Sequence, residues 1–177
     1  MKQSARGDTP PSPQPDVLSQ NVRSLSYYAK TKTSVMGVRR AAIKFTLGEL
    51  VSDKAITCLQ ETRLNRHEKG AMGQAFKQHH IYYNNYSNGK AGTLIIVPKS
   101  YLLSYSVQEV PLGPHARERV QLLLFTPLPS PEGRGARRPF AVANVYLTSG
   151  SGTARITSRC DELRSLARVS LAVLPAG

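Results

Sequence analysis

Glu61 is the residue of this sequence best suited to chemistry, because of the pattern that precedes it. Residues 56–59 form a short apolar run, and Gln60, Glu61 and Thr62 follow it directly. A run this short is typical of a buried strand, and it places the carboxylate of Glu61 at the C-terminal edge of a predicted sheet. Ligands of α/β proteins bind at such edges, and a fixed carboxylate is a suitable oxygen ligand for Mg²⁺. The alternative interpretation is a solvated glutamate at a strand-to-loop junction.

Two other predicted strands also carry polar side chains near their ends. Residues 16–23 predict a short strand that runs into a loop and carries Asn21, and residues 140–147 predict a buried strand that carries Tyr146. An amide and a phenol held on rigid strands are neutral hydrogen-bond donors. The alternatives are that Asn21 is a turn residue and that Tyr146 belongs to the core.

The elements that must position these residues are a mixture of predicted helices and strands. Asn88 and Gly89 are typical of a type I′ turn, so the runs on either side of them predict a hairpin. The last predicted helix has four residues on one stripe: Ile156, Cys160, Leu163 and Ala167. Helices are predicted at 35–51, 70–78 and 154–173, strands at 16–23, 56–59, 80–86, 91–97, 101–110, 117–125 and 140–147, and a loop at 126–138.

Positive charge is the strongest global feature of the chain. The chain has 177 residues, 40% of them hydrophobic, which is enough for one domain with a substantial core. Its net charge of +13 at pH 7 is spread along the whole length and favours polyanions, nucleic acid first and acidic membrane surfaces second. The predicted loop at 24–34 interleaves tyrosines and lysines, which suits contact with nucleic acid, although a loop without a function has equal support.

The remaining global features indicate an intracellular protein. Cys58 and Cys160 are too few for a disulfide scaffold, and both lie in apolar patterns, so we expect buried, reduced thiols in a nuclear or cytoplasmic protein. No run reaches the ~20 apolar residues of a membrane span, and we expect no membrane partner. Residues 1–15 are polar and proline-rich without the apolar segment of a secretory signal, and they predict a disordered lead-in to a domain at 16–177.

The order of these short motifs resembles the endonuclease/exonuclease/phosphatase superfamily. Residues 59–62 (Leu-Gln-Glu-Thr) look like its most recognisable signature, and residues 21–23 (Asn-Val-Arg), 92–96 (Gly-Thr-Leu-Ile-Ile) and 144–146 (Asn-Val-Tyr) are similar to its other motifs. The Asn-Val-Arg and Asn-Val-Tyr forms are most similar to the endonuclease domains of LINE-type retroelements. The resemblance covers most of the chain. It implies the deoxyribonuclease-like α/β fold, a four-layered sandwich of two mixed sheets flanked by helices.

The resemblance implies a role for each matched residue. Glu61 is the expected ligand of Mg²⁺, or alternatively of Mn²⁺, while Asn21 orients Glu61, the metal or the scissile phosphate, and Tyr146 donates its hydroxyl to that phosphate. The implied activity is metal-dependent hydrolysis of phosphodiesters, that of a DNA endonuclease of the retroelement type. A reverse transcriptase following in a longer polypeptide is an implied partner. Three further residues are expected to contact nucleic acid: Arg23, Arg63 and Asn144.

The chain departs from the family pattern after its third motif. The family's Gly-Asp-x-Asn motif, a further Asp and its Ser-Asp-His motif have no counterpart, because the last aspartate is Asp161 and every histidine precedes residue 144. In the family these residues handle the attacking water and contact the phosphate, so we expect little hydrolysis from this chain alone. Domains of this architecture commonly have ~200–250 residues. We therefore expect the N-terminal part of a longer domain: a gene fragment, a retroelement remnant or a truncated gene model.

Two other functions stay open. A phosphatase acting on a phosphorylated lipid or inositol has the same fold, although the positive charge fits nucleic acid at least as well. A basic nucleic-acid-binding remnant without catalysis would bind with a steep salt dependence and leave its substrate uncut. Because those motifs are absent from this chain, the non-catalytic alternative is at least as well supported as catalysis.

Overall fold

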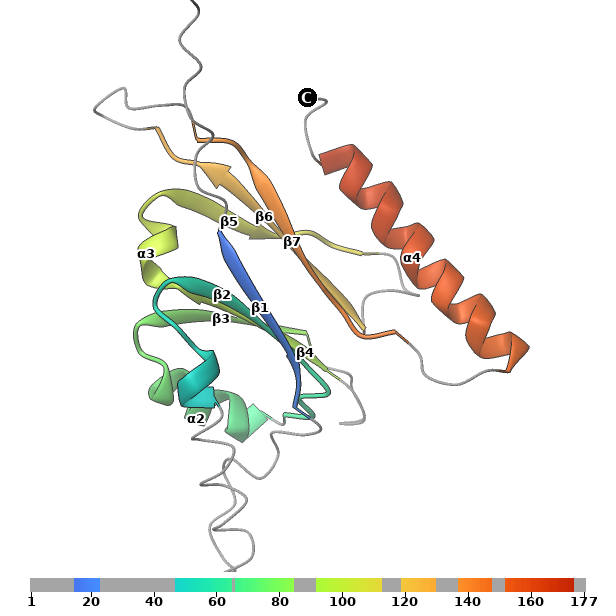
Figure 1. Cartoon of the computed structure of the whole chain (residues 1–177), viewed down its shortest axis with the longest axis horizontal. Coiled ribbons are helices and arrows are strands. Elements are labelled where there is room, and N and C mark those ends of the chain that lie inside the picture. The colour runs from blue at the N-terminus through green and yellow to red at the C-terminus, as the bar shows by residue number, and fades with distance from the viewer. Residues whose placement is uncertain are drawn as a thin grey trace, which may run out of the picture.

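The computed structural model describes residues 15–22, 47–64, 66–84, 92–112, 119–129, 137–147 and 152–173, and every structural statement below refers to these. They form two sheets packed face to face, with helix α2 on the outer side of one sheet and helix α4 beyond the other (Figure 1). The strands are β1 (Asp16–Asn21), β2 (Ala55–Gln60), β3 (His79–Asn84), β4 (Thr93–Pro98), β5 (Tyr105–Glu109), β6 (Val120–Pro127) and β7 (Phe140–Val145), and the helices are α2 (Arg66–Ala75), α3 (Lys99–Leu102) and α4 (Thr153–Val173).

The first sheet, sheet A, brings the ends of two strands to one edge. Its order is β1-β2-β4-β3, with β1 parallel to β2 and the other pairs antiparallel. Asn21 lies opposite Gln60, the last residue of β2, and Gln60 lies opposite Thr93. The second sheet, sheet B, has the order β5-β6-β7 with antiparallel neighbours. Residues 21 and 61 therefore emerge together at the same edge of sheet A.

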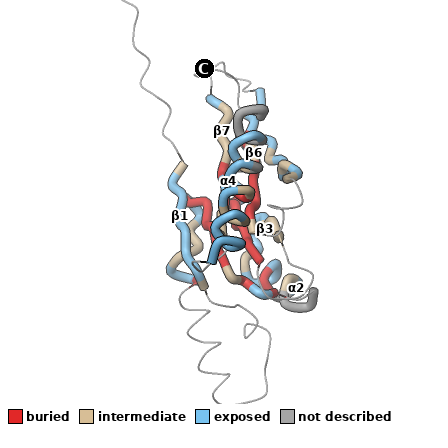
Figure 2. The backbone as a smooth tube through the Cα atoms, turned by 90° about the vertical axis from the view of Figure 1, so that its right-hand side faces the viewer, coloured by how far each residue is buried: buried red, intermediate tan, exposed pale blue. Residues whose placement is uncertain are grey.

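Strand β2 is buried along its whole length because both of its faces are covered. Leu59 packs with Met72 of α2 and Leu94 of β4 in one apolar cluster. Side chains of the opposite face, among them Ile56, pack against Phe125 of β6 in a second cluster between the sheets. A strand covered on both faces needs an uninterrupted apolar sequence, which is why the run at 56–59 predicts it. Figure 2 shows the buried backbone at the centre, while β1 and much of α4 are exposed.

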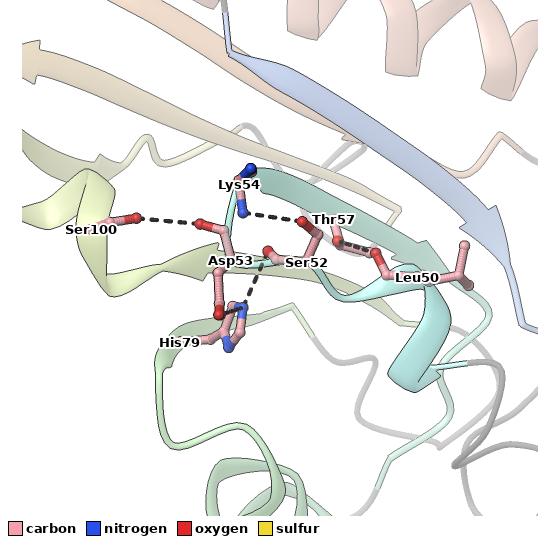
Figure 3. Close-up of polar contacts among 7 residues, drawn as sticks. All are labelled: Leu50, Ser52, Asp53, Lys54, Thr57, His79 and Ser100. Atoms are coloured by element: carbon pink, nitrogen blue, oxygen red, sulfur yellow. Dashed lines mark hydrogen bonds and ion pairs between the residues drawn. The ribbon is translucent and has the colours of Figure 1, made fainter.

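The opposite end of β2 is held by a turn that includes a histidine–carboxylate pair (Figure 3). His79 Nε2 lies 3.3 Å from the carbonyl oxygen of Ser52 and 3.5 Å from Asp53 Oδ1, and Ser100 Oγ donates to the carbonyl oxygen of Asp53 at 3.4 Å. Since β2 spans six residues at ~3.3 Å each, this pair lies ~20 Å from Glu61. It fastens the turn and stands apart from the edge where β1 and β2 end.

Several boundaries differ from those predicted. Helix α2 begins at residue 66 instead of 70, and the predicted strand at 101–110 begins with the short helix α3, so β5 starts only at residue 105. Pro98 is both the last residue of β4 and the N-cap of α3, so the helical turn follows β4 directly. Strand β6 extends to residue 127 because residues 126 and 127 still pair with β5. Helix α4 matches its predicted range within one residue.

The predicted burial of the Cys160 thiol on the last helix is wrong. Ile156 and Leu163 are each 47% exposed, and Cys160, expected as a buried thiol, is also exposed. Among the α4 side chains that the structure describes, Glu162 is the deeply buried one, at 1% exposure, and it accepts a hydrogen bond from Ser158 Oγ. Cys58 is buried as expected, and burial raises the pKa of its thiol to about 12.

Several predicted features lie outside the described residues. They are the lead-in before residue 15, the loop at 24–34, the turn around Gly89, and the predicted helix at 35–51 apart from residues 47–50, which are helical. Among the helices of the described segments, none has the length and apolar character needed to cross a membrane.

Candidate functional site

The backbone turns sharply where β2 ends, and this turn directs the Glu61 side chain. Glu61 and Arg63 both have left-handed backbone angles, with φ of 55° and 49°. Non-glycine residues rarely adopt this conformation, which costs roughly 1–2 kcal/mol per residue. Between them, the N–H of buried Thr62 donates to the carbonyl oxygen of Gly92 at 3.1 Å. Gly92 itself has φ of 134°, a region that favours glycine. Both segments joined by this hydrogen bond therefore contain residues with positive φ.

The Glu61 carboxylate is held by two neighbours. Asn21 Nδ2 donates to Glu61 Oε1 at 2.8 Å, a contact that the parallel pairing of β1 and β2 makes possible. Arg63 Nη2 lies 3.4 Å from Glu61 Oε2. The Glu61 side chain is 17% exposed and that of Arg63 is 45% exposed, so the pair lies at the surface, where an ion pair contributes little to stability. The predicted proximity of Asn21 and Glu61 is therefore present in the structure.

Tyr146 brings sheet B to the same place. It follows β7 and lies close enough to Glu61 for the carboxylate to act on its hydroxyl. Burial, together with the hydrogen bond to Glu61 and its negative charge, raises the pKa of Tyr146, while Arg119 acts in the opposite direction. The neutral phenol is therefore the favoured form, and a neutral phenol is a hydrogen-bond donor. The three residues expected in the site, from three strands and two sheets, thus share one corner of the molecule.

Arg119 is a member of this corner that the sequence analysis did not find. Its guanidinium carbon lies 5.2 Å from the centre of the Tyr146 ring, and its carbonyl oxygen accepts a hydrogen bond from the Tyr146 N–H at 2.8 Å. Arg119 could be identified from the pairing of β6 with β7. That pairing sets Val120, the residue after Arg119, opposite Val145, the residue before Tyr146. Arg63 lies beside Glu61 and Arg119 lies over the Tyr146 ring, so two guanidinium groups flank the site, an arrangement that favours an anionic ligand such as a phosphate.

The remaining predicted contacts to nucleic acid have different outcomes. Arg63 is exposed beside Glu61, as such a contact requires. Arg23 lies outside the described residues. Asn144 is only 1% exposed, and its amide is fully engaged inside the protein, so in this structure it lies between the sheets and presents no surface to a ligand. The buried position follows from its register on β7, two residues after Val142 of the inter-sheet cluster.

The residues of the corner fit a divalent metal ion only in part. Within the described segments, no group of three or more histidine, cysteine, aspartate or glutamate side chains gathers as a metal site. Glu61 offers one carboxylate, and the Asn21 amide carries a second hard oxygen. Mg²⁺ is commonly bound by one or two carboxylates, with water and substrate phosphate completing its shell. The donor set is therefore compatible with a Mg²⁺ ion that depends on water and substrate for most of its ligands.

No protein-family profile matches the sequence, and no curated protein sequence matches it. The catalytic domain of Xenopus laevis APE2 is structurally similar, with a TM-score of 0.59 and 17% sequence identity over 91% of this chain and 55% of that chain. A truncated Caenorhabditis elegans TDP2 aligns with a TM-score of 0.48 and 20% identity over 78% of this chain and 51% of that chain. This chain therefore spans about half the length of both structures.

The similarity to the APE2 domain confirms the predicted fold. The chain has the mixed α/β architecture of the deoxyribonuclease-like type, with two sheets flanked by helices, and covers 55% of the APE2 structure. This is the fold that the resemblance to the endonuclease/exonuclease/phosphatase superfamily implies. At 17% identity the likeness concerns the fold, and function has to be argued from the site.

Proposed function

We propose that this chain carries part of the active site of a metal-dependent phosphodiesterase that acts on nucleic acid. The observation that carries the proposal is that Asn21 and Tyr146, which come from two other strands, both contact the carboxylate of Glu61. A solvated surface glutamate does not require contacts from neighbouring side chains, whereas a ligand-binding carboxylate has to be held in a fixed orientation. The flanking guanidinium groups of Arg63 and Arg119 and the net charge of +13 favour a polyanionic substrate.

Each residue has a role in this proposal that its geometry supports. Bound at Glu61, Mg²⁺ or Mn²⁺ would supply positive charge to offset the charge that develops on the phosphate. Tyr146, a neutral phenol, donates a hydrogen bond to a phosphate oxygen, and Asn21 fixes the rotamer of Glu61. Arg63 and Arg119 attract the phosphate. The finer assignment, a DNA endonuclease of the retroelement type, rests on the motif forms Asn-Val-Arg and Asn-Val-Tyr.

A second proposal, nucleic-acid binding without cleavage, is favoured by a specific observation. Hydrolysis needs a group that accepts a proton from the attacking water. The described residues contain a histidine–carboxylate pair, His79 with Asp53, but it lies at the far end of β2, ~20 Å from Glu61. It therefore cannot reach a phosphate bound at Glu61.

Nicking of supercoiled plasmid DNA by the full chain in Mg²⁺ separates the two proposals. The test variant is Glu61→Gln, which keeps the side-chain shape and removes the charge. The matched control is Asp53→Asn, the same change at a carboxylate whose side chain is 81% exposed at the other end of β2. We expect nicking that is abolished by EDTA and by Glu61→Gln and kept in Asp53→Asn. Equal nicking by both variants would contradict the site.

A folded protein that does not nick the plasmid would contradict catalysis. In that case, DNA binding that weakens steeply as salt rises would support the non-catalytic proposal, because each released counterion adds to the slope. If the protein also fails to bind DNA at low salt, nucleic acid is not its ligand.

A further inference from the structure

Three polar side chains that precede the three candidate site residues in sequence are bonded to one another. Ser19 precedes Asn21 by two residues on β1, and Gln60 comes immediately before Glu61 on β2. Asn144 precedes Tyr146 by two residues on β7, in the other sheet. We call Ser19, Gln60 and Asn144 the support row. Each member of the row lies within two residues of one site residue.

The support row is joined by a continuous set of hydrogen bonds. Gln60 Nε2 donates to Ser19 Oγ at 3.0 Å and to Asn144 Oδ1 at 2.6 Å. Asn144 Nδ2 donates to the carbonyl oxygens of Leu59 and Leu94 at 3.0 and 2.9 Å. An amide nitrogen has two hydrogens to donate, so both amides use their full donor capacity. Because Leu59 and Leu94 are cross-strand partners, a single Asn144 side chain is bonded to two strands of the facing sheet.

This row supplies something that the apolar packing between the sheets does not. Hydrophobic contact is non-directional, so the cluster around Phe125 holds the sheets together without selecting one lateral alignment. A buried network whose members are all satisfied specifies one arrangement, because any shift leaves polar groups unpaired. Gln60 is 8% exposed and Asn144 is 1% exposed, so water is a poor substitute for either partner.

We propose that Ser19, Gln60 and Asn144 are positioning residues that align Tyr146 on sheet B with Glu61 and Asn21 on sheet A. The meaning of this alignment for catalysis rests on the proposed function, but the alignment itself is a property of the fold. The Asn144–Gln60 contact fixes β7 against the end of β2, and the Gln60–Ser19 contact fixes β1 against the same end. The two contacts that meet at Glu61, from Tyr146 and from Asn21, lie one step further along these strands.

The test variant is Gln60→Met, which keeps the length and burial of the side chain and removes the central link of the row. The matched control is Val142→Ala, a buried residue of β7 in the inter-sheet cluster whose truncation weakens the same interface without touching the row. Both folds are checked by circular dichroism. The readout is the pKa of Tyr146, followed by NMR of ¹³C-labelled tyrosine, because that pKa is raised partly by contact with Glu61.

We expect Gln60→Met to move the pKa of Tyr146 down toward its ordinary value, and Val142→Ala to leave it unchanged. Equal shifts in the two variants, or no shift in either, would overturn the proposal. If Gln60→Met does not fold, Ser19→Ala replaces it, since Ser19 lies on exposed strand β1 and its loss is tolerated more easily. A smaller shift in the same direction is then expected, and its absence would be equally decisive.

Plasmid nicking separates this proposal from the proposed function. If the wild-type chain nicks DNA, Gln60→Met should reduce the rate tenfold or more, as loss of supporting contacts around metal sites commonly does. Val142→Ala, at the same extent of folding, should keep most of the activity. If the wild-type chain does not nick DNA while the Tyr146 pKa still depends on Gln60, the proposed function fails and the positioning role stands.

Discussion

The left-handed backbone at Glu61 leads to a quantitative prediction about stability. Glycine adopts this conformation without the clash of a Cβ atom, so Glu61→Gly should relieve the strain that Glu61→Ala retains. Both variants lose the carboxylate and its contacts to Asn21 and Arg63, so these losses cancel when the two are compared. The difference between them therefore isolates the backbone contribution.

The size of that difference follows from two opposing contributions. Removing the left-handed clash gains roughly 1–2 kcal/mol, and the greater freedom of glycine in the unfolded chain costs about 0.5–1 kcal/mol. We therefore expect Glu61→Gly to have a free energy of unfolding about 0.5–1 kcal/mol higher than Glu61→Ala. In a chain of this size that corresponds to a melting temperature higher by roughly 1–4 °C.

Urea unfolding followed by circular dichroism measures this difference, with the denaturant dependence (m) held common to both variants. Gln74, an exposed residue within α2, provides the matched control. There the backbone is right-handed, so Gln74→Gly should be less stable than Gln74→Ala by about 1 kcal/mol, the opposite sign. If Glu61→Ala is as stable as Glu61→Gly, the turn stores no strain and the reasoning fails. If the expected sign is found, glutamate is retained at 61 against the preference of the backbone.

Three further measurements test other parts of the structure. At pH 7.5, iodoacetamide should modify exposed Cys160 and spare buried Cys58, whose pKa is about 12. Mass spectrometry of digested peptides measures the labelling of each thiol. Fast labelling of both thiols in the native protein would contradict the packing of β2. Glu61→Gln should lower the pKa of Tyr146, measured by NMR titration, because the negative charge beside the phenol is removed. An unchanged pKa of Tyr146 in the variant would exclude the Glu61 contact. In the wild type, the contribution of the raised Tyr146 pKa to stability is complete below the ordinary pKa of 10.0 and is lost as pH rises through the raised value. Phe125→Ala should lower the free energy of unfolding by about 3–5 kcal/mol in urea denaturation, because the ring is completely buried between the sheets, and a loss below ~1 kcal/mol would contradict this packing.

The parts of the fold that sequence predicts well are those fixed by local pattern. The run at 56–59 predicts β2 because a strand covered on both faces has to be apolar throughout, and Glu61 follows from the end of that run. The bounds of α4 follow from helical spacing, but its orientation does not. Spacing shows that Ile156 and Leu163 share a face, whereas which face meets the sheet depends on contacts with β6 that no local pattern contains.

The candidate site divides in the same way. Asn21, Glu61 and Tyr146 were predicted from the order of short motifs, and the structure brings them together. Arg119 and the true surroundings of Asn144 were missed, because both depend on pairings between segments distant in sequence. Gln60 and Asn144, for example, are 84 positions apart, and their contact exists only once the sheets have packed. Sequence thus indicates candidate site residues, while the contacts that hold them require the tertiary structure.

The exposure of β1 has a consequence for how the site assembles. All six residues of β1 are exposed, and among the described strands it pairs with β2 alone. Strands with few buried contacts open at a lower free energy than the core, in local fluctuations that leave the rest of the protein folded. Asn21 therefore reaches Glu61 from the most weakly anchored strand of sheet A. Formation of the complete site and folding of the core are then separate equilibria, so a ligand that contacts Asn21 and Glu61 together would shift the first while leaving the second almost unchanged.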